Sequence, residues 1–301
     1  MTIKKVLIFG AGYSGMAFAR ANKDPGTTIV GTTRSQEKFE ALREAGITPI
    51  LFENTVGILD EISAVTHLII SVPPDEAGDP ILGTFSEPIE QWMPALEWVG
   101  YLSTVGVYGD HGGDWVDETS HCRPVSKRSI MRVKAERQWL KFGSKTIFVP
   151  VAILRLSGIY GPGRNALVNL ENGTARRLVK PGQVFNRIHC DDIAGALWHL
   201  AEGNRGGIFN VTDDLPAPPQ NVVAYAASLM GIEPPPEIPF ETAQLSPMAR
   251  SFYGENKRVA NAAIKAAGYR FRFPDYRSAL DAMWASGDWR DGEARSPMKR
   301  S

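Results

Sequence analysis

Near the start of the chain, three glycines stand in the run Gly10-Ala11-Gly12-Tyr13-Ser14-Gly15. In such a G-x-G-x-x-G run the first glycine allows a tight turn, and the second lets the backbone approach a pyrophosphate. The third lets a helix pack closely on a strand. The free N–H groups at the start of that helix stabilise the phosphate charge. The spacing therefore predicts a dinucleotide site that also includes Tyr13 and Ser14.

The segment Thr32-Thr33-Arg34-Ser35 bears on which dinucleotide binds. An NAD-selective protein usually carries an Asp or Glu about 20 residues beyond the glycine loop, where it holds the ribose 2′-hydroxyl. No acid follows directly here. The Arg34 guanidinium and the hydroxyls of Thr33 and Ser35 can instead bind a 2′-phosphate. We predict NADP as the cofactor, with NAD as the alternative; the competing interpretation is that Arg34 only faces solvent.

The elements around these residues alternate between strand and helix. Val- and Ile-rich runs predict strands at 5–9, 28–32, 48–52, 67–72, 98–103 and 146–155, and helical patterns cover 14–22, 36–45 and 125–142. This alternation is typical of a parallel sheet with crossover helices. The predicted fold class is α/β, a doubly wound parallel sheet of the Rossmann type with a smaller C-terminal substrate lobe.

The pattern changes after Gly161-Pro162-Gly163 to short elements separated by Pro and Gly. We predict a dinucleotide-binding domain over 1–160, a substrate lobe over 161–288 and a frayed tail over 289–301. A strand at 207–211 is expected to return to the main sheet. Further helices are expected at 192–201, 221–229, 257–267 and 276–285.

Composition excludes several classes of protein. Lys and Arg number 33 against 33 Asp and Glu, so no net charge draws the chain to nucleic acid or to an anionic membrane. No apolar stretch approaches the ~20 residues that span a bilayer. The two cysteines, Cys122 and Cys190, lack the spacing of a zinc site, and no metal is predicted. We expect a soluble cytoplasmic protein whose partner is a small-molecule substrate, with a homodimer left open.

Five segments, taken together and in this order, resemble the extended short-chain dehydrogenase/reductase superfamily, in its NAD-dependent epimerase/dehydratase-like group. They are the glycine loop and residues 103–109 (STVGVYG), 117–119 (DET), 155–163 (RLSGIYGPG) and 189–194 (HCDDIA). The resemblance implies that Thr104 hydrogen-bonds the substrate oxygen, with Ser103 as the alternative residue. It also implies cofactor contacts from two strand ends: Val72, Pro73, Ser157 and Gly158.

The resemblance further implies a Tyr-x-x-x-Lys pair on the helix expected at 125–142. Lys134 fits the lysine position and would hold the nicotinamide ribose, but Ile130 stands where the tyrosine should be. Isoleucine has no proton to transfer, so either another group replaces the phenol or the standard redox chemistry has been lost. The groups considered as replacements are Arg128, Ser129, Arg132 and Tyr108.

The leading hypothesis is an NAD(P)-dependent oxidoreductase or epimerase acting on a hydroxyl or carbonyl carbon. The expected substrate is small and sugar-like or nucleotide-linked, and Arg187 and Tyr108 are its expected contacts. The alternative is a dinucleotide-binding sensor or regulatory protein that has lost catalysis, which Ile130 favours. His189, ahead of Asp191-Asp192, is expected to begin a helix with acids in its first turn.

Overall fold

A computed structural model describes residues 5–85, 89–145 and 149–290. A seven-stranded sheet in the order β11-β7-β5-β4-β1-β2-β3 forms its centre, and each neighbouring pair is parallel. Its strands are β1 (Lys5–Phe9), β2 (Thr28–Thr33), β3 (Thr48–Leu51), β4 (His67–Ile70), β5 (Trp98–Thr104), β7 (Val151–Leu156) and β11 (Gly207–Val211). The predicted doubly wound α/β fold is confirmed.

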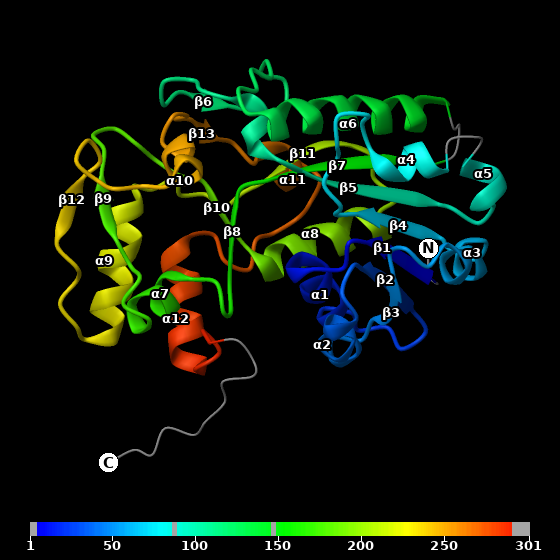
Figure 1. The fold of residues 1–301 in the computed structure, drawn as a ribbon, viewed down its shortest axis with the longest axis horizontal. Helices are drawn as coiled ribbons and strands as arrows, with labels where there is room; N and C mark the ends of the chain where they lie inside the picture. The colour runs from blue at the N-terminus through cyan, green and yellow to red at the C-terminus, as the bar shows by residue number, and fades with distance from the viewer. Residues whose placement is uncertain (1–4, 86–88, 146–148, 291–301) are drawn as a thin grey trace, which may run out of the picture.

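Both faces of this sheet are covered. Residues of β4 and β7 are buried throughout, as expected for parallel strands packed on two sides. Ile8 and Leu154 point into one core, and Leu7 and Ile153 into the other. The first core is closed by α1 (Tyr13–Arg20), α2 (Phe39–Glu44), α8 (Cys190–Glu202) and α11 (Ala262–Ala266), and the second by α3 (Thr55–Ile62), α4 (Pro80–Thr84) and α6 (Lys127–Lys145) (Figure 1).

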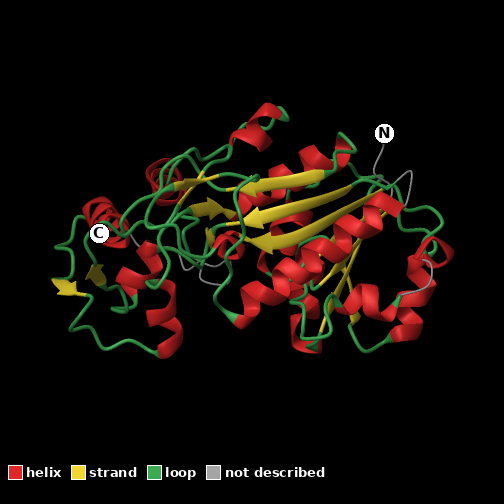
Figure 2. Ribbon diagram, turned by 90° about the horizontal axis from the view of Figure 1, so that it is seen from above, coloured by secondary structure: helices red, strands yellow, loops and turns green. Residues whose placement is uncertain are grey.

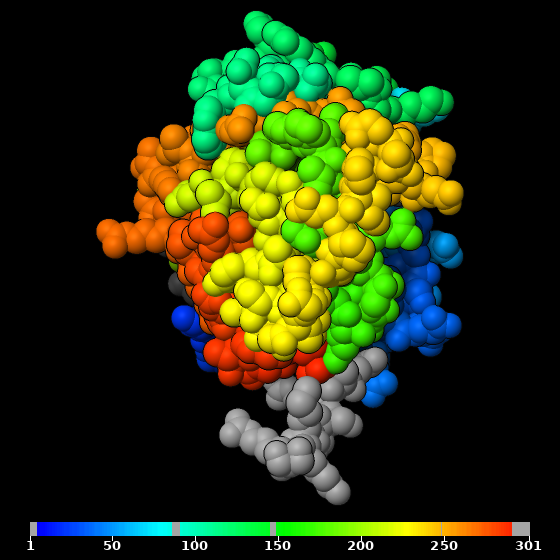
Figure 3. Space-filling view, turned by 90° about the vertical axis from the view of Figure 1, so that its left-hand side faces the viewer, coloured from blue at the N-terminus to red at the C-terminus, as the bar shows by residue number. Residues whose placement is uncertain are grey.

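The small lobe lies beyond the carboxyl ends of the main strands, toward which their arrowheads point in Figure 2. The lobe has an apolar core of its own, the third in the molecule, built by α7 (Ala166–Glu171), α9 (Pro219–Met230) and α12 (Tyr276–Ser286). The outer surfaces of these helices face the viewer in Figure 3. Short parallel pairs join the lobe: β8 (Gly158–Tyr160) with β10 (Arg187–His189), β9 (Arg177–Val179) with β12 (Glu237–Pro239), and β6 (Trp115–Val116) with β13 (Arg258–Val259).

The remaining short elements are α5 (Ile89–Trp92), α10 (Pro247–Phe252) and the 3₁₀ helices η1 (Gln36–Lys38) and η2 (Val105–Tyr108). The helix expected at 257–267 begins only at Ala262, because Arg258 and Val259 pair with β6 instead. Residues 146–148 of the strand expected at 146–155 lie outside the described residues, and the strand itself starts at Val151. Within the described part of the chain, no helix is long and apolar enough to cross a membrane.

The frayed tail predicted from residue 289 onward is wrong for its first two members. Trp289 is only 3% exposed, and its carbonyl accepts hydrogen bonds from Gly163 N and Asn165 Nδ2. Arg290 packs its guanidinium on the Trp289 ring and pairs with Glu171. Indole burial therefore fixes this segment on the small lobe; residues 291–301 lie outside the described residues.

Candidate functional site

The glycine loop joins β1 to α1. Gly10 has φ +84°, and a Cβ on it would lie 3.0 Å from Val72 Cγ1 and 3.1 Å from Val72 N, so only glycine fits. A Cβ on Gly12 would instead meet no described atom nearer than Gly10 O at 4.0 Å. No side chain caps the first turn of α1. The loop thus presents an open backbone face and a helix N-terminus, the arrangement that anions bind.

The end of β2 holds this loop in place. Thr32 Oγ1 accepts a hydrogen bond from Gly10 N at 3.0 Å, and Thr32 O accepts one from Ala11 N at 2.8 Å. A Cβ on Gly31 would lie 2.6 Å from that of Ala11, so this glycine lets the loop pack on β2. Sequence reasoning missed both Gly31 and Thr32. The sequence indicates these two residues only through the predicted position of β2, which ends beside the loop.

Arg34 follows directly after β2. It is exposed, and the described residues offer it no hydrogen bond or ion pair. Thr33 is buried, and its Oγ1 accepts a hydrogen bond from Ser35 N at 3.3 Å. The three residues therefore sit at the strand end next to the glycine loop, with the guanidinium free to take an anion.

The ends of β4 and β5 bring the other expected residues to the same edge of the sheet. Val72 packs against Gly10 of the glycine loop, and Pro73 beside it is exposed. Thr104 is partly exposed; its Oγ1 accepts a hydrogen bond from Gly106 N at 3.1 Å, and its own proton has no acceptor among the described residues. Ser103 differs, because its hydroxyl donates to the buried Glu136 carboxylate. Thr104 is therefore the hydroxyl available to a ligand.

Helix α6 does not turn Ile130 and Lys134, the two positions predicted from the spacing, toward the sheet. Lys134 is exposed and donates to Glu76 O at 2.8 Å, and Ile130 is 51% exposed. Both line an open groove of about 450 Å³ on the outer side of the helix. Arg132 is the side chain that reaches the end of β5, where its Nη1 donates to Leu102 O at 2.6 Å and to Tyr101 Oη at 3.1 Å. Arg132 thus occupies the sheet-facing position expected of Lys134.

A buried polar network explains this orientation. The Glu136 carboxylate, 3% exposed, pairs with Arg155 at 2.8 Å and turns the Glu136 side of α6 inward. Arg155 Nη1 donates to Tyr108 Oη at 3.0 Å, and Tyr108 donates to Asn210 Oδ1 at 2.7 Å. Burial raises the pKa of Tyr108 to about 12. Tyr108, predicted as a substrate contact, is fully buried with both hydrogen-bonding roles used, so the structure does not bring it to the open edge.

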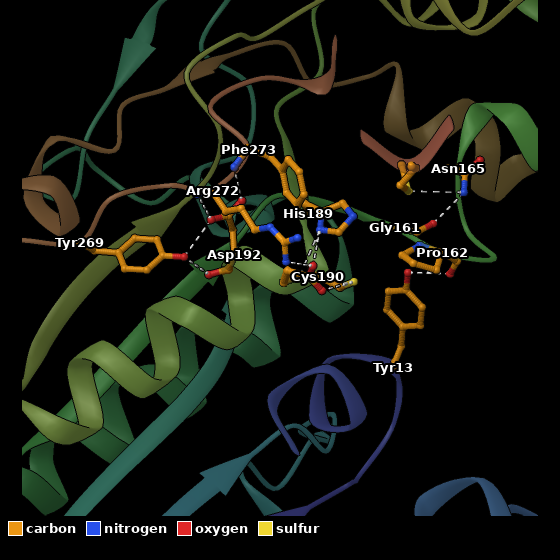
Figure 4. A network of polar contacts seen from close by, with 12 residues as sticks. Tyr13, Gly161, Pro162, Asn165, His189, Cys190, Asp192, Tyr269, Arg272 and Phe273 are labelled. Atoms are coloured by element: carbon orange, nitrogen blue, oxygen red, sulfur yellow. Dashed lines mark hydrogen bonds and ion pairs between the residues drawn. The ribbon is translucent and has the colours of Figure 1, made fainter. Parts of the chain in front are cut away.

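The segment after β7 joins the glycine loop to the small lobe. Ser157 is buried against Val211, while Gly158 is exposed and its N–H donates to Asn186 O. Tyr13 Oη donates to Pro162 O at 2.9 Å, so the glycine loop touches the small lobe directly (Figure 4). Ser157 and Gly158, the expected cofactor contacts, therefore lie at the boundary between the main sheet and the small lobe.

The residues at the start of α8 have structural partners. His189 caps the helix, its Nδ1 accepting from Asp191 N, and Asp192 accepts from Tyr269 Oη, Arg272 N and Phe273 N (Figure 4). His189, Cys190 and Asp191 place three ligand-type atoms within 4.8 Å of one another. Asp191 pairs with Arg272, and burial raises the pKa of the Cys190 thiol to about 12. Capping and ion pairing use His189 Nδ1 and the carboxylates, while His189 Nε2 is buried without a hydrogen-bond partner among the described residues.

No family model matches the chain. A solved structure of a functionally unknown conserved protein from Silicibacter pomeroyi is 45% identical, spans 95% of this chain and 99% of its own, and has a TM-score of 0.86. A Methylobacillus flagellatus structure, described as a candidate NAD-dependent epimerase/dehydratase, is 26% identical with a TM-score of 0.70, over 95% of this chain and 99% of its own. In fold and in the five sequence segments named above, the chain is similar to the NAD-dependent epimerase/dehydratase-like group of extended short-chain dehydrogenases/reductases.

Two further proteins extend the comparison. Protein YeeZ of Escherichia coli K12 is 28% identical over 298 residues, which are 91% of this chain and 97% of that protein. A human epimerase family protein solved with NADPH is 18% identical, spans 93% of this chain and 99% of its own, and has a TM-score of 0.68. At that identity it shows the fold of the extended short-chain dehydrogenase/reductase family alone.

Proposed function

We propose that this protein binds NADP(H) at the glycine loop and interconverts a carbonyl and a hydroxyl group on a small substrate. The observation that carries the proposal is the open face at Gly12, together with an exposed Arg34 that has no hydrogen bond or ion pair to the described residues. Gly10, Gly12 and the first turn of α1 fit a pyrophosphate, and Arg34, Thr33 and Ser35 fit a 2′-phosphate. The NADPH of the human relative supports a nicotinamide dinucleotide as the cofactor.

The chain's own residues would assist the reaction at the ends of β4 and β5. A bound nicotinamide supplies or accepts the hydride. Thr104 can donate its free proton to the substrate oxygen and so stabilise the negative charge that develops there. Arg132 adds a fixed positive charge beside the end of β5. With Ile130 on the outer face of α6, the hydroxyl of Thr104 is the group that we propose to hydrogen-bond the substrate oxygen in place of a phenol.

The first prediction concerns cofactor choice. Arg34→Ala should weaken NADP(H) binding and leave NAD(H) binding nearly unchanged, because the guanidinium contacts only the 2′-phosphate. A charge-assisted hydrogen bond contributes about 1.5–3 kcal/mol, which is roughly a ten- to hundredfold change in Kd. Calorimetry with both cofactors measures it, and Arg20→Ala, at the far end of α1, controls for lost charge. Equal losses for the two cofactors, or tighter NAD(H) binding by the parent, would rule out NADP selectivity.

The second prediction concerns the reaction itself. If Thr104 polarises the substrate oxygen, Thr104→Ala should lower kcat by about 10²–10³-fold with NADPH and a responsive carbonyl compound. Thr104→Ser should restore most of the rate, because it keeps the hydroxyl and the bond from Gly106 N. Initial rates over a panel of small aldehydes and ketones measure both variants. A Thr104→Ala protein as fast as the parent would remove Thr104 from the reaction.

The second candidate function is a dinucleotide-binding sensor without catalysis. The hydroxyls of Ser103 and Tyr108 are committed to the buried network, and Ile130 faces outward. A parent protein that binds NADPH and turns over no member of the carbonyl panel, in either direction, would favour this alternative.

A further inference from the structure

A second cavity, of about 380 Å³, lies in the small lobe between α7, α9 and α12. Its walls are mostly apolar or aromatic: Ile159, Tyr160, Pro219, Val222, Val223, Tyr276 and Leu280. Arg187, on β10, is the charged side chain set among them, while Arg164 lines the cavity from an exposed position. The cavity therefore combines an apolar and aromatic wall with the cation of Arg187 and the amides of Asn165 and Asn169.

Arg187 is charged without a counter-charge. Its Nη1 donates to Phe185 O at 2.9 Å and to Ala217 O at 3.0 Å, and its other N–H groups have no partner in the described part of the chain. No described carboxylate lies within 4.0 Å of it. Burial lowers the pKa of the guanidinium, because a charged group is less stable away from water. Arg187 is partly exposed where it lines the cavity, so its free N–H groups can pair with an anion that enters there.

The nearest acid does not supply that partner. Asp213 is 1% exposed and one of its oxygens, Oδ2, has no hydrogen bond. Burial raises its pKa to about 8, although the positive charge of Arg187 acts in the opposite direction. The Tyr160 hydroxyl is likewise buried without a partner among the described residues. The surroundings of Arg187 therefore contain unpaired polar atoms, and among the described residues Asp213 forms no ion pair with Arg187 within 4.0 Å.

We propose that this cavity binds a small organic carboxylate whose oxygens pair with Arg187 and whose apolar or aromatic body lies against Val222, Val223 and Tyr276. The planar guanidinium matches a carboxylate bidentately. The volume, about 380 Å³, is at the small end of the ~300–1,000 Å³ range of ligand pockets, which suits a small acid better than a nucleotide-linked sugar. Only the claim that this acid is the substrate rests on the proposed function; the binding does not.

Benzoate is a suitable probe, with benzamide as the uncharged molecule of the same shape. Calorimetry on the full chain without cofactor should show benzoate binding and benzamide binding at least about tenfold more weakly. Arg187→Gln should weaken benzoate roughly ten- to hundredfold, since it removes a charged hydrogen-bonding partner. Arg176→Gln, an exposed neighbour in the same lobe, should change it little.

Arg187 also donates to two backbone carbonyls, so its substitution changes the fold locally as well as the cavity. Val223→Trp is a second test variant, because it fills the cavity and leaves the guanidinium in place. It should abolish benzoate binding while Arg187 keeps its partners. Equal binding of benzoate and benzamide, or benzoate binding unaffected by Val223→Trp, would overturn the site. Inorganic phosphate or UDP displacing benzoate and binding more tightly would overturn the carboxylate assignment.

Turnover separates this proposal from the proposed function. NADPH-dependent reduction of 2-oxo acids, with Arg187→Gln raising KM and sparing kcat, would support both. Benzoate binding without any turnover would keep the site and reject the oxidoreductase. Turnover of neutral ketones with KM unchanged by Arg187→Gln would keep the oxidoreductase and reject a substrate role for the carboxylate.

Discussion

Gly12→Val should abolish dinucleotide binding and leave the protein folded. Gly12 has φ −106°, which other residues adopt without strain, and a Cβ there meets no described atom closer than 4.0 Å. The added side chain therefore stands where a pyrophosphate would contact the loop, and not inside the core. A loss of binding beyond calorimetric detection, with an unchanged circular dichroism spectrum and Tm, is the expected result.

Gly15→Ala is the matched control for that variant. A Cβ on Gly15 would lie 3.4 Å from Ile8 Cγ2, an ordinary contact on the protein side of α1. NADPH affinity should therefore stay near that of the parent. A Gly12→Val protein that bound NADPH as tightly as the parent would show that the glycine loop is not the cofactor site.

Arg155→Met should destabilise the fold by about 3–5 kcal/mol, because it leaves the Glu136 carboxylate charged and buried without its partner. The change also removes a donor from Tyr108 Oη, so the contact between β7 and η2 weakens. Urea unfolding followed by tryptophan fluorescence measures the loss. The double variant Glu136→Leu/Arg155→Met should recover much of it, because both charges are then absent.

An exposed ion pair gives the comparison for this stability effect. Lys265 pairs with Asp214 at the surface, with about 40% of each side chain exposed. Lys265→Met should cost no more than about 1 kcal/mol, since water and salt screen such pairs. If Arg155→Met cost as little as Lys265→Met, the buried network would not be what orients α6.

The glycine loop and the strands around it were predictable because their signals are local. Gly10, Gly12 and Gly15 act within one turn of the chain, and β1, β2 and β4 are short apolar runs bounded by turns. Arg34 could be placed at the end of β2 for the same reason. The tight fit at Gly31 depends on Ala11 of the glycine loop packing on β2, and this contact between separate segments carries no local signal.

The face of α6 could not be predicted in the same way. Ile130 and Lys134 have the four-residue spacing of a catalytic pair, but spacing alone does not say which side of a helix meets the sheet. The side is set by Glu136, whose partner Arg155 lies on β7. Tyr108 was misjudged for a related reason, because its hydroxyl is drawn inward by Arg155 and Asn210, residues distant in the chain.

Strand β11 limits how this protein can be divided or grafted. It pairs with β7 at the edge of the main sheet, yet it follows the small-lobe segment that contains β8–β10. A fragment ending at residue 160 would leave β7 as a bare edge with unpaired N–H and C=O groups, which invites edge-to-edge aggregation. It would also lack α8, which covers the same sheet. A new small lobe must therefore be spliced in around α8 and β11, because these two elements pack in and on the main sheet.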